Sequence, residues 1–196
     1  MRAIDHACET LGSLNSTAEA DSWASEALSA LVPSLLKCKQ GGDITDFSKC
    51  QYGSWKAILP VTYSGIMLGA SHAVGHKLGG LFDVPHGYTS CVMLAPTLAF
   101  NKKVNAQRQA KIIEAFKGLG IGEFDDAAGY VDAYVRALGL PRTFGDVGVH
   151  EDQLGQLAEA CPNDFWSPNN PIPMKTPEQF LELFEIVKSY KSSAQV

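Results

Sequence analysis

The sequence lacks several features that would define its class. Charged residues make up only 19% of its 196 residues and the formal net charge is -5, so neither nucleic acid nor an anionic membrane surface is expected as a partner. The sequence contains no run of alternating β-branched residues of the kind typical of strands, and no internal repeat. With 45% hydrophobic residues, these absences favour an all-α protein of ordinary globular composition.

The cysteines also lack the number and spacing of a disulfide framework. The number of cysteines is odd, no C-x-x-C occurs, and no secretory signal opens the chain. Reduced thiols and a cytoplasmic location are therefore expected. We interpret each cysteine as a small buried apolar residue; the five are Cys8, Cys38, Cys50, Cys91 and Cys161.

Only the stretch 57–75, "AILPVTYSGIMLGASHAVG", is apolar enough to suggest a membrane span. Pro60, the polar residues 62–64 and His72 interrupt it. A buried helix explains this composition better than a bilayer span, and we expect no membrane partner.

Several local signals mark where helices begin. Ser16 and Glu19 have the spacing of a capping box, and Asp43 can cap the helix that follows. Thr176 and Gln179 form a second capping-box pattern. These signals predict a compact multi-helix bundle over residues 1–191, followed by a frayed tail at 192–196.

Other signals mark where helices break. Pro60 is expected to interrupt one helix, and "DVPHG" at 83–87 is expected to form a turn. Pro96 predicts a kink in a helix that ends near residue 101. A further amphipathic helix is expected from Asn105 to Leu119.

Histidine is scarce, yet three of the five histidines lie in "SHAVGHKLGGLFDVPHG", residues 71–87. His72 and His76 share one helix face, His86 follows the turn, and His6 comes from a separate helix. Three neutral imidazoles with an open position make a catalytic site for Zn²⁺ or Fe²⁺, which would polarise a carbonyl or acidify an alcohol. Histidines buried in an ordinary core are the alternative interpretation.

Four segments resemble a known family. They are "RAIDHACE" (2–9), "GASHAVGHKLGGLFDVPHGYTSCVMLAPTLAFN" (69–101), "LPRTFGDVGV" (140–149) and "NNPIPMKTPEQFLELF" (169–184). They are similar to the iron-containing, or group III, alcohol dehydrogenases, whose close relatives include the maleylacetate reductases. The resemblance runs from Met1 to about Tyr190.

The resemblance implies a fold and a set of roles. Members have an N-terminal α/β half that binds NAD(P) and an all-helical C-terminal half that carries the metal; this chain resembles only the helical half, the C-terminal domain of the dehydroquinate synthase-like fold. His6, His72 and His86 would be metal ligands. His76 would lie beside the nicotinamide and relay protons, which replaces the interpretation from spacing that His72 and His76 chelate together.

The chain departs from the family pattern at Arg2. The family has an aspartate ligand there, four residues before the histidine that corresponds to His6, and a guanidinium cannot ligate a cation. Asp5 lies about 100° around the helix from His6 and is a poor substitute. Maleylacetate reductases also lack the aspartate. One hypothesis is that Arg2 binds a substrate carboxylate through two hydrogen bonds and replaces the electrostatic role of the metal. The alternative is that Arg2 is a solvated charge.

No glycine-rich dinucleotide fingerprint follows any strand, so the cofactor half is expected to be absent. We therefore expect the substrate and metal half of an NAD(P)-dependent oxidoreductase that acts on a small-molecule alcohol or carbonyl. It would be inactive alone, and NAD(P) would bind only when the missing dinucleotide-binding half is supplied. The alternative is a non-catalytic module left from a truncated dehydrogenase, which binds a metal or forms homo-oligomers.

Overall fold

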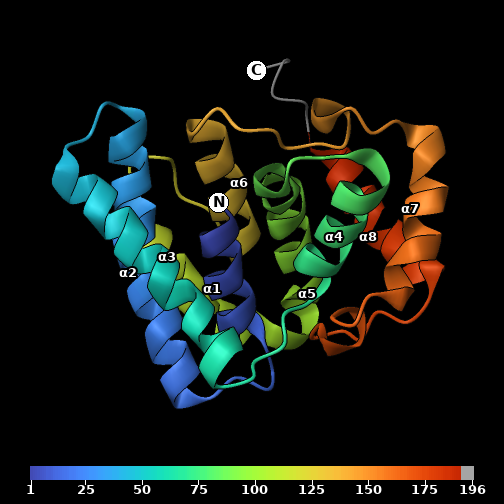
Figure 1. The fold of residues 1–196 in the computed structure, drawn as a ribbon, viewed down its shortest axis with the longest axis horizontal. Coiled ribbons are helices and arrows are strands. Elements are labelled where there is room, and N and C mark those ends of the chain that lie inside the picture. Colours follow the sequence, from blue (N-terminus) through green and yellow to red (C-terminus); the bar gives the residue numbers. More distant parts are fainter. Residues whose placement is uncertain (191–196) are drawn as a thin grey trace.

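The computed structural model describes residues 1–190, and these residues form helices joined by short loops, with no strand among them (Figure 1). The predicted all-α fold is confirmed. The predicted tail at 192–196, and residue 191 of the predicted domain, lie outside the described residues. The α-helices are α1 (Arg2–Gly12), α2 (Ala18–Lys39), α3 (Ile44–Tyr63), α4 (Ala70–Phe82), α5 (His86–Phe116), α6 (Ala127–Ala137), α7 (Leu154–Ala160) and α8 (Pro177–Ser189). Short 3₁₀ turns are η1 (Gly145–Val147), η2 (Glu151–Gln153), η3 (Cys161–Asn163) and η4 (Ser167–Asn169).

Helix α2 begins one residue later than its capping signal predicts. The residue before the first turn is Thr17, and its hydroxyl accepts a hydrogen bond from the backbone N–H of Ala20 at 3.1 Å. Ser16 instead donates its hydroxyl to the Asp21 carboxylate at 2.7 Å. The predicted Ser16 capping box is therefore wrong, because a nearby carboxylate takes the serine hydroxyl.

The other two predicted helix starts are confirmed. The Asp43 carboxylate accepts from the backbone N–H groups of Thr45 and Asp46, at 2.8 and 3.1 Å. Thr176 precedes α8, and the side-chain oxygen of Gln179 accepts from the backbone N–H of Thr176 at 3.1 Å. Both signals act within one helical turn, so packing elsewhere does not override them.

The break between α3 and α4 lies after Pro60, not at it. Pro60 is inside α3, which continues to Tyr63, and the chain then leaves the helix over residues 64–69. Gly65 has a φ of +63°, a left-handed conformation that costs glycine little and ends a helix. No helix within residues 1–190 has both the length and the apolar character needed to cross a membrane.

Helix α5 is interrupted at Asn105, where φ is -134° and ψ is 21°, rather than at the predicted Pro96. The Asn105 amide donates to the carbonyl of Gly12 at 2.8 Å, which ties this break to the end of α1. The Gln109 amide reaches back to the carbonyl of Leu98 at 2.8 Å. The interruption coincides with the predicted start of the second helix at Asn105.

Two hydrophobic clusters make up the core, and α5 contributes to both. Figure 1 shows α1, α2 and α3 on one side of the molecule and α7 on the other, with α4 and α5 between them. The α2-side cluster draws on α1, α2, α3, α5 and α6, and includes Leu11, Leu28, Leu94, Phe116 and Tyr134. The α8-side cluster draws on α4, α5, α7 and α8, and includes Val74, Leu78, Met93, Leu157 and Leu183.

Candidate functional site

Two histidines from helices far apart in the sequence lie together where α1 meets α4. His6 is in the second turn of α1 and His72 is in the first turn of α4. Their ring centroids are 4.6 Å apart and their planes are inclined by 12°. Ile4 and Leu11 of α1 pack into the α2-side cluster, and the polar face of the helix is left to meet α4.

Glu9 connects α1 to the start of α4. Its two carboxylate oxygens accept hydrogen bonds from the backbone N–H groups of Gly69 at 3.1 Å and Ser71 at 3.0 Å. Helix α4 has no side-chain cap of its own, so this buried carboxylate from another helix satisfies its free N–H groups and its positive dipole end. A Cβ on Gly69 would lie 2.7 Å from Asn170 and 3.0 Å from Glu9, which leaves glycine as the residue that fits.

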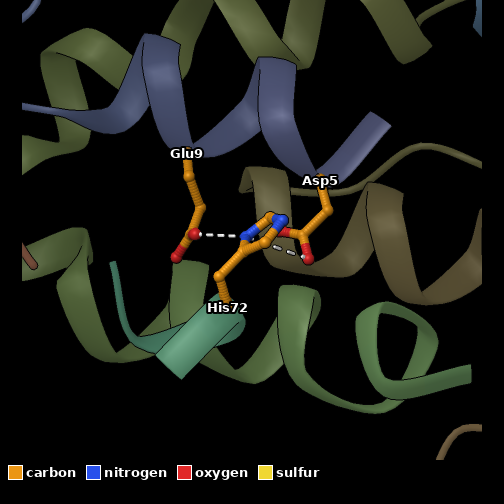
Figure 2. A group of neighbouring side chains, drawn as sticks. All are labelled: Asp5, Glu9 and His72. Atoms are coloured by element: carbon orange, nitrogen blue, oxygen red, sulfur yellow. Dashed lines mark hydrogen bonds and ion pairs between the residues drawn. The ribbon is translucent and has the colours of Figure 1, made fainter. Parts of the chain in front are cut away.

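The same Glu9 carboxylate orients His72. Its Oε2 lies 2.7 Å from His72 Nδ1, and because an ionised carboxylate only accepts, Nδ1 donates its proton (Figure 2). His72 Nε2 is buried and has no hydrogen-bond partner among the described residues. The geometry therefore presents one imidazole nitrogen that is free to hold a ligand.

Asp5 lies on the Nδ1 side of His72 as well. Its Oδ2 accepts from the Ser71 hydroxyl at 2.8 Å and lies 3.6 Å from His72 Nδ1 (Figure 2). Burial raises the pKa of Asp5 to about 6, partly offset by His72. One ligand atom each from Asp5, Glu9 and His72 all lie within 4.8 Å of one another. The other oxygen, Asp5 Oδ1, is buried and has no hydrogen-bond partner among the described residues.

The carboxylates favour a positive charge on His72. Burial by itself lowers the pKa of His72, but the charge of Asp5 and the hydrogen bond to Glu9 outweigh it, and the pKa is raised. A proton or a metal ion on Nε2 would meet the same favourable field. The charges around His72 are therefore compatible with a cation bound at its Nε2.

The pKa values of Arg2 and His6 are lowered, whereas that of His72 is raised. Burial, followed by the neighbouring His72 and Arg2, lowers the pKa of His6 to about 3, so His6 is neutral at physiological pH. Burial also lowers the pKa of Arg2, whereas Asp5 and Glu9 raise it. His6 is thus held in the form that ligates metals, and the guanidinium charge of Arg2 acts directly on it.

A second histidine pair lies beside the first. The rings of His76 and His86 are 6.1 Å apart and nearly parallel, at 4°. His76 Nδ1 lies 2.9 Å from Oδ2 of the buried Asp164, so this nitrogen donates and Nε2 is left for other partners. Burial, then the charge of Arg2, lowers the pKa of His86. His86 opens α5 as its first residue, immediately after Pro85.

Trp166 joins the two histidine pairs. Its ring lies 5.3 Å from that of His72 and 4.9 Å from that of His76. The structure therefore brings together the five residues that the sequence singled out: Arg2, His6, His72, His76 and His86.

An open cavity of about 460 Å³ reaches this site from the surface. Arg2 and His6 line it, and Gly87 places it next to His86. Helix α3 supplies the opposite wall with Cys50, Ser54 and Ile58. A small organic molecule fits a space of this size.

Sequence reasoning missed three contributors to the site. The spacing of four residues between Asp5 and Glu9 signals a shared helix face. Asp164 and Trp166 come from an irregular proline-rich segment whose position no periodicity reports. The ring of Trp166 contacts those of two of the predicted site histidines, His72 and His76.

Known proteins share this arrangement of helices. The profile described as "Fe-containing alcohol dehydrogenase family, C-terminal" matches residues 1–187. The chain is 33% identical over 177 residues to Dehydrogenase ALT3 of Alternaria alternata, covering 83% of this chain and 45% of that protein. A crystal structure of a 1,3-propanediol oxidoreductase matches with a TM-score of 0.82 and 26% identity, over 95% of this chain and 50% of the other. The maleylacetate reductase of Rhizobium sp. strain MTP-10005, at 24% identity and a TM-score of 0.80, shares the fold; the match covers 94% of this chain and 49% of that one.

The class that the fold and the site define is an all-helical domain in which four histidines gather, with His6 and Arg2 lining an open cavity. The chain belongs to the Fe-containing alcohol dehydrogenase family and corresponds to its C-terminal part. The resemblance found in the sequence is confirmed. The chain spans about half the length of the curated relatives that it matches, 45% in the case of the Alternaria protein.

Proposed function

We propose that this chain is the substrate- and metal-binding half of an NAD(P)-dependent oxidoreductase acting on a small alcohol or carbonyl compound. The observation that carries the proposal is the convergence of four imidazoles from α1, α4 and α5, of which His6 lines an open cavity. Membership of an oxidoreductase family supports the same reaction class. Hydride transfer would require a dinucleotide-binding part in addition to residues 1–190.

His6, His72 and His86 are the proposed ligands of Fe²⁺ or Zn²⁺. His6 is kept neutral by burial, and His72 directs an unpartnered Nε2 away from Glu9. Imidazole nitrogens suit both metals. When bound, such an ion polarises a carbonyl oxygen or lowers the pKa of an alcohol.

His76 is the proposed proton carrier and the proposed contact of the nicotinamide. Asp164 accepts the Nδ1 proton and thereby leaves Nε2 as the atom that takes up or releases a proton. His76 is partly exposed, so its proton can exchange with solvent. Phe165 and Trp166 cover the ring and limit how it turns.

Arg2 is the proposed substrate-binding residue. It lines the cavity beside His6, and a guanidinium matches a carboxylate through two parallel hydrogen bonds. Burial, and then the charge of Arg2, lowers the pKa of His86. The guanidinium therefore also acts on a second proposed metal ligand. In one version of the proposal Arg2 binds the substrate next to a metal, and in the other it replaces the metal.

Metal analysis separates these versions. The first predicts one equivalent of Fe or Zn per chain after purification, lost in His72→Ala and kept in the matched control His150→Ala, whose histidine lies outside the site. The second predicts no stoichiometric metal and binding of small carboxylates that Arg2→Gln abolishes. If wild-type protein binds neither metal nor carboxylate, both versions are wrong.

A second candidate function is association without catalysis. Four large hydrophobic side chains on α3 are exposed by half or more, and exposed apolar surface of this kind favours protein contacts: Ile44, Phe47, Trp55 and Tyr63. An NAD(P)H oxidation assay with carbonyl substrates, run with and without an added dinucleotide-binding domain of the family, discriminates. Activity restored by the added domain supports the enzyme; no activity in either case, together with a stable homo-oligomer, supports association.

A further inference from the structure

Cys38 and Cys50 form a thiol pair that the proposed function does not use. Cys38 lies in the last turn of α2, Cys50 lies in the second turn of α3, and their sulfur atoms are 3.9 Å apart. The prediction that every cysteine is buried is wrong for these two, which are half-buried. The other three cysteines are fully buried elsewhere: Cys8, Cys91 and Cys161.

Small solutes can reach both sulfur-bearing residues. Cys50 lines the cavity of about 460 Å³ that leads to His6. Cys38 lines a neighbouring hollow of about 370 Å³, and Met1 lines both spaces. The pair therefore stands at the edge of the candidate site, beside the first residues of α1.

We propose that a peroxide oxidises Cys38 and Cys50 to a disulfide bond that links α2 to α3 beside the candidate site. One thiolate attacks a peroxide oxygen, the O–O bond breaks, and a sulfenic acid forms while the other oxygen leaves as hydroxide and becomes water. The second thiol then attacks the sulfenic sulfur, forms the S–S bond and releases a second water. The two sulfurs lose two electrons, and hydrogen peroxide gains them.

The environment assigns an order to the two thiols. Burial, followed by the hydrogen bond and charge of Cys38, raises the pKa of Cys50 to about 11, so Cys50 is a poor first nucleophile. Cys38 therefore makes the first attack and Cys50 completes the bond. A disulfide needs the sulfurs about 2.05 Å apart, which rotation of the two side chains must supply.

Peptide mapping tests the proposal on the purified chain and does not depend on the proposed function. After treatment with hydrogen peroxide and alkylation of the remaining thiols, trypsin releases Cys38 in the dipeptide 38–39 and Cys50 in the peptide 50–56. We expect these two peptides to be joined, with the chain lighter by the mass of two hydrogen atoms, and to separate after dithiothreitol. Separate recovery of the two peptides, or linkage of either one to another cysteine, would overturn the proposal.

Variants and a stability measurement complete the test. Cys38→Ser and Cys50→Ser should abolish the joined peptide, whereas Ser54→Ala alters the same cavity wall and should retain it. Closing a loop of this length should raise the unfolding midpoint of wild type by about 5–10 °C on oxidation, reversed by dithiothreitol and absent from Cys50→Ser. An unchanged midpoint in a fully linked chain would show that the bond does not restrain the α2–α3 hairpin.

Discussion

The α2-side and α8-side clusters are similar in chemistry, but the contacts between them are of a different kind. Each cluster is made of aliphatic and aromatic side chains that are almost completely buried. Between α1 and α4, by contrast, the contacts are hydrogen bonds that the start of α4 donates to the carboxylates of Asp5 and Glu9. Apolar contacts have little directional preference, whereas each hydrogen bond sets a distance and an angle.

Asn170 extends this polar network from α4 to α5. Its Oδ1 accepts from the backbone N–H of Ala70 at 3.1 Å and from the Asn101 amide at 2.9 Å. Its amide donates in return to Asn101 at 2.7 Å. We infer that the two clusters supply most of the stability. The polar network between them sets how α1, α4 and the η4 loop are placed.

The largest expected effects come from removing apolar volume in each cluster. Leu28→Ala and Leu183→Ala truncate fully buried side chains, and each should lower the free energy of unfolding by about 2–5 kcal/mol. Since α5 belongs to both clusters, unfolding in urea should remain one transition by circular dichroism and by tryptophan fluorescence. Two separated transitions in either variant would show that the clusters unfold independently.

Loss of the Glu9 carboxylate should cost nearly as much as a core truncation. Glu9→Ala leaves the N–H groups of Gly69, Ser71 and His72 without their acceptor, and we expect a loss of about 3 kcal/mol. Glu9→Gln retains one carbonyl oxygen and should lose less. The matched control is Glu182→Ala on the exposed face of α8, with a change within about 0.5 kcal/mol. Equal stability of Glu9→Ala and this control in urea would contradict the role of the polar network.

Loss of the cap at the start of α3 should change the free energy of unfolding by less than loss of Glu9. Asp43→Ala removes the acceptor for the first N–H groups of α3 and should lower the free energy of unfolding by about 1 kcal/mol. Asp125→Ala, at an exposed aspartate outside any helix, is the control. Chemical denaturation measures both, and a loss in the control as large as in Asp43→Ala would exclude the cap as the cause.

An effect of similar size, confined to part of the pH range, concerns the contact between α2 and α5. Burial alone would raise the pKa of Asp21, but hydrogen bonds from Lys111 and Ser16 and the charge of Arg108 outweigh it and lower the pKa. A lowered folded-state pKa stabilises the fold above the unfolded value of about 3.9, and this contribution is lost as the pH falls through the folded-state pKa. Asp21→Asn should therefore lose about 1 kcal/mol above pH 5, and its difference from wild type should shrink below about pH 4.

Unfolding measured from pH 7 down to pH 2 tests this sign. Asp152→Asn, at an exposed aspartate near α7, is the control and should show no such convergence. A difference between Asp21→Asn and wild type that stays constant across this range would contradict the lowered pKa of Asp21.

Much of the fold could be predicted because its signals are local. The helical periodicity, the Asp43 cap and the Thr176–Gln179 box each depend on residues within one turn of one another. The errors arose where a group from outside the local turn intervened. The Asp21 carboxylate takes the Ser16 hydroxyl, and the carbonyl of Gly12 binds Asn105 at the break in α5, whereas the kink predicted at Pro96 is not found.

The sequence by itself determined an all-helical chain and the set of histidines and arginine that resembles a dehydrogenase family. Only the tertiary structure decided that Glu9 orients His72 from 63 residues away and that Asp164 orients His76 from 88 residues away. It also brought Cys38 and Cys50 within 3.9 Å across a helical hairpin. Helix formation depends on neighbours three or four residues apart, whereas these contacts exist only after burial of the apolar faces has fixed the positions of the helices.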